Sequence, residues 1–184
     1  MNKLLNLIIF IIIYLPINTY SQNDEDYFEI LSASSFIREE VYFLDAWIDY
    51  RISEETIQAL ESGVNLLFTT EVEFVRKRFY WLDAVDASLI QTYQLEYNAL
   101  IQRYVIFNQN SGTQNYFVTL FSALNYIGRI NELPLIDASL LEADYIYDVR
   151  IRTSLTIESL RSVLTLMQFW RNDSVQSDWY RWQL

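Results

Sequence analysis

The side chains with the clearest chemical potential form a basic and aromatic run near the middle of the sequence. Arg76, Lys77 and Arg78 lead directly into Phe79-Tyr80-Trp81, and Asp83 follows. Cationic side chains interleaved with aromatic rings can hold a polyanion or a membrane interface. The alternative is a strand end that emerges into water, where the arginines offset nearby carboxylates. The net charge of −11 favours this alternative.

A second aromatic concentration lies near the C-terminus, where Trp170, Trp179 and Trp182 are three of the five tryptophans. Strand alternation would place Trp179 and Arg181 on one face, and Trp182 on the other. The segment is then either a final strand that closes the sheet or an exposed platform for a sugar, a peptide or a partner protein. We favour the closing strand. The candidate partner contact predicted from both regions comprises Arg76, Arg78, Trp81, Asp83, Trp179, Arg181 and Trp182.

Acidic pairs are the other groups that could do chemistry. A glycosidase needs two carboxyl groups about 5–10 Å apart in a cleft, one of them with a raised pKa. Nothing in the sequence places such a pair in a pocket, so we expect solvated acidic faces instead. The pairs concerned are Asp83 with Asp86, Glu71 with Glu73, and Asp45 with Asp49.

Missing residue types exclude most other catalytic chemistry. The chain has no cysteine and no histidine, which removes disulfides, thiol nucleophiles, histidine-based triads and the usual zinc ligands. Three glycines are too few for a phosphate-binding loop. Lys77 has no serine at the spacing of a serine–lysine dyad. We therefore predict a protein that is not an enzyme and holds no cofactor or metal.

The N-terminus has the pattern of a secretory signal. Lys3 precedes an apolar run over 4–15, Pro16 interrupts that run, and Ser21 follows as a fair cleavage residue. The run is shorter than the ~20 residues that a membrane-spanning helix needs. We expect a signal peptide over 1–21 and a single exported, periplasmic domain over 22–184, with an uncleaved inner-membrane anchor as the alternative.

Composition limits the partners of this domain. The chain of 184 residues is 52% hydrophobic and 16% aromatic, which suffices for one packed core without disulfides. Its excess of acidic over basic residues argues against binding to nucleic acid and against broad contact with an anionic membrane. Membrane contact is therefore expected only through an uncleaved signal segment.

In the segments that position these residues, apolar and polar side chains alternate mostly with a period of two, which is typical of strands. Apolar and polar residues separate onto alternate positions most clearly over 44–52, where Trp47 lies on the polar side, and over 143–157. In the strand over 89–97 we assign Gln91 to the outward side. The expected strands cover 27–33, 44–52, 64–74, 89–97, 101–107, 143–157 and 178–182.

Two segments have helical features instead. Ser53 can cap a short helix that stops at Gly63, and Thr119 can cap an amphipathic helix over 119–130, which Pro134 prevents from continuing. Apolar spacing allows a third helix over 158–168. The predicted fold is mainly β (α+β): a single antiparallel, sandwich-like domain with two short inserted helices.

Three motifs carry a family resemblance: Arg-Phe-Tyr-Trp-Leu-Asp over 78–83, Thr-Tyr-Gln-Leu-Glu-Tyr-Asn-Ala-Leu over 92–100, and Ser-Asp-Trp-Tyr-Arg-Trp over 177–182. The pattern resembles a proteobacterial family of exported proteins known only as a domain of unknown function (forty-three ninety). The resemblance implies a Gram-negative envelope protein without established activity. Members are often encoded beside a nitrogen-regulation-type sensor kinase, which implies a signalling accessory. Residues 158–168 lack the prolines expected there, so the resemblance is weakest in that region.

Two hypotheses of function follow. The first is a non-enzymatic periplasmic accessory protein that acts through an envelope protein partner, with a sensor kinase as the implied candidate. The second is a carrier that encloses a small apolar ligand or a lipid inside the β domain. A bound mass in native mass spectrometry would favour the carrier.

Overall fold

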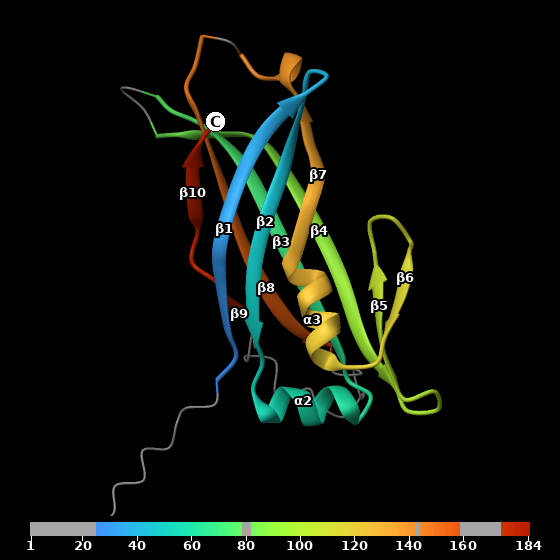
Figure 1. Cartoon of the computed structure of the whole chain (residues 1–184). Helices are drawn as coiled ribbons and strands as arrows, with labels where there is room; N and C mark the ends of the chain where they lie inside the picture. The colour runs from blue at the N-terminus through green and yellow to red at the C-terminus, as the bar shows by residue number, and fades with distance from the viewer. Residues whose placement is uncertain (1–24, 79–81, 143, 159–173) are drawn as a thin grey trace, which may run out of the picture.

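The computed structural model describes residues 25–78, 82–142, 144–158 and 174–184 (Figure 1). The predictions for residues 1–21 and for Trp81 lie outside these ranges, as does the helix predicted over 158–168 apart from Glu158, which is the last residue of a strand. In chain order the elements are β1 (Tyr27–Arg38), β2 (Val41–Arg51), α2 (Glu54–Glu61), β3 (Asn65–Arg76), β4 (Ala84–Asn98), β5 (Arg103–Asn108), β6 (Gln114–Phe117), α3 (Leu120–Gly128), β7 (Arg129–Asp137), a 3-10 turn (Ala138–Leu140), β8 (Tyr147–Glu158), β9 (Ser174–Gln176) and β10 (Tyr180–Gln183).

The strands form two antiparallel sheets. The small sheet has the order β1-β2-β7, and the large sheet has the order β10-β8-β3-β4-β5-β6 with β9 beside β8. In Figure 1 the small sheet lies across the large one, and α2 lies at one end of the molecule. The predicted sandwich-like α+β fold with two inserted helices is therefore confirmed.

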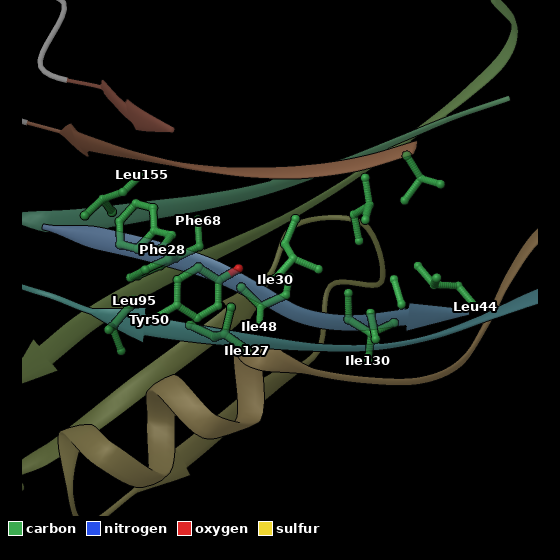
Figure 2. Close-up of a cluster of buried hydrophobic side chains, with 14 of the residues drawn as sticks. Phe28, Ile30, Leu44, Ile48, Tyr50, Phe68, Leu95, Ile127, Ile130 and Leu155 are labelled. Carbon is green, nitrogen blue, oxygen red and sulfur yellow. The ribbon is translucent and has the colours of Figure 1, made fainter. Parts of the chain in front are cut away.

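The core fills the space between the two sheets. Phe28 and Tyr50 of the small sheet point toward Phe68 of the large sheet (Figure 2). The ring of Tyr50 lies 5.0 Å from that of Phe68 and 5.3 Å from that of Phe28, both edge to face. Such aromatic contacts add to the stabilisation from buried apolar area.

Helix α2 begins and ends where the sequence predicts. The Thr56 amide donates to Ser53 Oγ at 3.2 Å, which makes Ser53 the N-cap. Asp26 reinforces this cap, since its carboxylate accepts from the Ser53 amide at 2.6 Å and from Thr56 Oγ1 at 2.8 Å. Leu60, on the inner side of α2, is fully buried, and Gly63 follows the helix with a φ of 93°.

Helix α3 ends earlier than predicted. Thr119 is its N-cap, as expected, but the helix stops at Gly128 and β7 begins at Arg129 without a loop. The expected helix over 119–130 was therefore wrong at its C-terminal end, and β7 was missed. Pro134 lies inside β7, where it is tolerated because β7 is an edge strand.

Two other predictions about strands need correction. The strand predicted over 143–157 begins at Tyr147. Gln91 was predicted to face outward, but it is buried at 8% exposure and lies opposite Thr70 on β3. The alternation of its neighbours puts position 91 on the inner face, and the error came from assigning the face by residue type.

A small polar group lies inside this apolar core. The Tyr50 hydroxyl lies 2.8 Å from Thr153 Oγ1, and the Thr153 hydroxyl lies 3.3 Å from the Thr69 carbonyl oxygen, which accepts from it. Tyr50 and Thr153 are both buried. Burial raises the pKa of Tyr50 to about 12, because the interior disfavours the phenolate.

This raised pKa predicts a loss of stability at alkaline pH. The Tyr50 pKa is higher in the folded chain than the ordinary value of 10, so its contribution is fully present below pH 10 and is lost as the pH rises toward 12. We expect wild type to exceed Tyr50→Phe by about 1 kcal/mol in unfolding free energy at pH 8. This difference should fall by on the order of 2–3 kcal/mol toward pH 12, so that its sign reverses. Urea unfolding of both proteins at several pH values measures it; a constant difference would contradict the prediction.

Candidate functional site

The basic run at the end of β3 is largely engaged in ion pairs. Arg76 is 16% exposed; its Nε lies 2.9 Å from Asp86 and its Nη1 lies 2.6 Å from Glu142. Its guanidinium also lies 4.7 Å from the ring centre of Tyr145. These contacts match the alternative in which the arginines offset nearby carboxylates.

The rest of this run is exposed. Lys77 pairs with Asp148 at 2.8 Å, and the Arg78 amide donates to the Asp83 carboxylate at 3.4 Å. Arg78 and Asp83 therefore lie close together at the surface, in the segment between β3 and β4.

Trp179 lies on the outer face of the large sheet. Its ring centre is 4.3 Å from the guanidinium carbon of Arg150 and 4.4 Å from that of Arg152. Each arginine is held in turn by its cross-strand neighbour on β3, since Arg150 pairs with Glu73 and Arg152 pairs with Glu71. The tryptophan thus packs on a ladder of charged pairs, which fixes the chain just before β10.

Trp182 lies on the opposite face, as strand alternation predicts. Its Nε1 donates to Ser35 Oγ of β1 at 2.8 Å, and the side chain packs against the core. Arg181 pairs with Arg150 of β8 in the strand register and is exposed. β10 thus links the large sheet to β1 of the small sheet along one side of the sandwich. Trp179 and Trp182 therefore do not form one continuous surface.

The predicted carboxylate pairs are engaged in structural contacts. Besides Glu71 and Glu73, Asp86 accepts from the Tyr147 hydroxyl at 2.9 Å, and Asp45 accepts from the Glu132 amide at 2.7 Å. Asp49 pairs with Arg51 at 2.9 Å. Across the described ranges, no group of three or more acidic side chains is arranged to hold a metal ion.

A different surface presents aromatic and basic side chains together: the outer face of the small sheet. We call it the Trp47 face. Trp47 is 47% exposed, and the Arg129 guanidinium lies 5.3 Å from its ring centre. Tyr27 is 52% exposed, with Arg51 at 6.0 Å. The Trp47 face consists of Tyr27, Phe36, Arg38, Phe43, Trp47, Arg51 and Arg129.

Stacked side chains order the part of the Trp47 face that lies near the turn between β1 and β2. The rings of Phe36 and Phe43 stack at 5.6 Å, and the Arg38 guanidinium lies 4.6 Å from the Phe43 ring centre. Arg38 also forms two hydrogen bonds to Glu132, at 3.2 and 3.1 Å. These bonds and the charge of Arg38 lower the pKa of Glu132, so the pair stays ionised at neutral pH.

Sequence reasoning placed Trp47 on the polar side of its strand but did not select it. The available signal was a tryptophan that alternates with Asp45, Asp49 and Arg51, since a large aromatic residue on a polar face is unusual.

Among the pockets in the described part of the chain, two lie at the rims of the sandwich. The first, of about 350 Å³, is lined by Tyr42, Tyr145 and Leu184 among others. The second, of about 370 Å³, lies between the start of β1 and the segment that joins β9 to β10. Both are bounded partly by polar groups.

These features define a two-sheet β domain that presents a mixed aromatic and basic face. The family model described as "Domain of unknown function (DUF4390)" matches residues 25–183. The chain belongs to this family, which confirms the predicted membership. No curated protein and no solved structure matches the chain. None of the helices that the structure describes is long and apolar enough to cross a membrane.

Proposed function

We propose that this protein is a non-enzymatic periplasmic accessory protein that binds an envelope protein partner through the Trp47 face. The single observation that carries the proposal is the exposed Trp47, which is stacked with Arg129 in the middle of a sheet face. Tryptophan, tyrosine and arginine are the residue types that contribute most to binding energy at protein interfaces.

The rigidity of the face supports this proposal. Its side chains project from strands of the small sheet, and several are already ordered by stacking or by ion pairs. Binding of a partner would therefore cost these side chains little conformational entropy. Charges of both signs lie on this side of the small sheet, with Asp45 and Asp49 of β2 near Arg51 and Arg129 of the Trp47 face, which suits a partner with complementary polar groups.

The partner that we favour is the extracytoplasmic part of a sensor kinase. This part of the proposal rests on the gene neighbourhood that the family resemblance implies. The carrier hypothesis has less support, because large side chains such as Phe68 and Leu44 fill the space between the sheets.

Trp47→Ala should abolish most of the partner binding without unfolding the domain. A central tryptophan at an interface typically contributes at least ~2 kcal/mol, so we expect a loss of capture of about thirtyfold. The measurement is in-cell crosslinking of the tagged full-length protein, followed by purification and quantitative mass spectrometry.

Leu100→Ala is the matched control, because Leu100 is 95% exposed in the turn between β4 and β5, away from the Trp47 face. It should capture the partner as wild type does. Equal capture by Trp47→Ala and wild type would show that this face is not the contact. Recovery of no envelope protein, together with a bound apolar mass in native mass spectrometry, would favour the carrier.

A further inference from the structure

The segment between Arg103 and Arg129 contains no charged side chain. Residues 104–128 are 25 consecutive uncharged positions in a chain in which 20% of residues are charged. They form most of β5, all of β6 and all of α3. The chain therefore contains a long uncharged segment, although its net charge is strongly negative.

Large apolar side chains are exposed in this region. Tyr116, Val118 and Phe121 are 58%, 68% and 76% exposed, and they follow one another from β6 into the start of α3. Tyr126 of α3 packs against β6. Its hydroxyl accepts a hydrogen bond from Asn115 Nδ2 at 3.0 Å, and its ring lies 5.2 Å from that of Phe117. The exposed residues therefore lie on and next to a strand that packs against α3.

The backbone of β6 also has free hydrogen-bonding groups. β6 pairs only with β5 among the described strands. The Asn108 amide donates to the Thr113 carbonyl, and bonded pairs alternate along an antiparallel ladder. The N–H and C=O groups of Gln114 and Tyr116 therefore point away from β5, toward the open edge.

Two other strand edges, those of β7 and β1, carry features that hinder pairing. β7 contains Pro134, register irregularities and a positive φ at Glu132. β1 is tied to β10 through the contact between Ser35 and Trp182. β6 has no proline, no charge and no irregularity in its pairing. Unprotected edges of this kind pair with another strand.

We propose that two copies of this chain associate by antiparallel pairing of their β6 edges. Net negative charge makes most surfaces of two copies repel each other, whereas the uncharged region can approach its own copy without this repulsion. An antiparallel pair of identical strands is self-complementary about a two-fold axis, which is the commonest symmetry of homo-oligomers. The inference goes beyond the proposed function, because β6 belongs to the large sheet and the Trp47 face to the small one.

The symmetry restricts the register. A two-fold axis perpendicular to the sheet keeps each side chain on its own face, so one residue of β6 lies opposite its own copy. Pairing along the whole of β6 centres the axis on the strand, with position 115 or position 116 opposite its own copy. In either register the exposed Tyr116, Val118 and Phe121 of one copy lie near those of the other, and their apolar surface is buried on association.

Sedimentation velocity of the purified exported protein tests the proposal. Wild type should show a dimer whose fraction rises with concentration. The double variant Val118→Glu with Phe121→Glu should weaken self-association roughly tenfold or more, because it places like charges around the two-fold axis. The control double variant Leu82→Glu with Leu140→Glu adds the same charge at exposed positions elsewhere and should still dimerise.

Single cysteines give a second measurement, because the chain has none of its own. Asn115→Cys or Tyr116→Cys should form an intermolecular disulfide under mild oxidation, since opposed residues in a ladder have Cα atoms about 4.5–5.5 Å apart. Leu140→Cys should not. The proposal is overturned if wild type stays monomeric at every concentration, if both double variants weaken association equally, or if all three cysteine variants crosslink to the same extent.

Discussion

Replacing Phe68 by alanine is expected to lower the free energy of unfolding by about 3–5 kcal/mol. Phe68 is fully buried in β3, where its ring contacts Tyr50 at 5.0 Å and Phe28 at 6.4 Å. The substitution removes the apolar area that joins the two sheets and leaves a cavity between them. A domain of this size has a total stability of about 5–15 kcal/mol, so the loss is a large fraction of it.

Urea unfolding followed by tryptophan fluorescence measures this effect. Phe68→Leu should recover part of the loss, because leucine refills some of the cavity with apolar atoms. Leu100→Ala should change the free energy by less than about 0.5 kcal/mol, since Leu100 is exposed in a turn. A loss below about 1 kcal/mol for Phe68→Ala would mean that the two sheets do not pack as described.

The alternating pattern was sufficient to predict most strands and their inner faces. In β3 and β8, apolar residues occupy every second position except at Thr70 and Thr153, and the structure places this alternating series on the inner face. Capping residues were equally informative, since Ser53 and Thr119 both begin helices. In these cases the local energetics of a strand face or a helix end decide the structure, and the sequence carries them directly.

Features that depend on distant contacts were not predictable in the same way. The turn between β1 and β2 consists of Glu39 and Glu40, both with positive φ, although neither is a residue type that favours such a turn. β7 was missed because its strand follows α3 directly and contains Pro134. In both cases the pairing with β2 stabilises the local structure, and a single sequence does not display that pairing.

The candidate site shows the same limit. Alternation correctly put Trp179 and Trp182 on opposite faces, but it could not show that Arg150 and Arg152 of β8 lie beneath Trp179. Nor could it show that the face of Trp47 is left open by the described elements. The sequence indicates which face of a strand a side chain occupies, whereas the fold determines what covers that face.

Gly128→Ala is expected to destabilise the domain by about 3 kcal/mol or more. Gly128 is the last residue of α3, and α3 leads directly into β7. A β-carbon at this position would overlap the Ile48 carbonyl oxygen and lie 3.3 Å from the carbonyl carbon. These are backbone atoms of β2, so no side-chain rotation relieves the contact. Alanine favours a helix over glycine by only about 1 kcal/mol, so the steric term dominates.

Gly112→Ala separates this steric effect from the general cost of losing a glycine. Gly112 has a φ of 72° in the loop between β5 and β6, and a β-carbon there would meet no atom within 4 Å. Its substitution should cost only about 1–2 kcal/mol, which is the usual penalty for alanine in the left-handed region. Urea unfolding of both variants gives the comparison. If Gly128→Ala is no less stable than Gly112→Ala, then α3 can move away from β2 freely, and the close approach of Gly128 to Ile48 does not hold the helix in place.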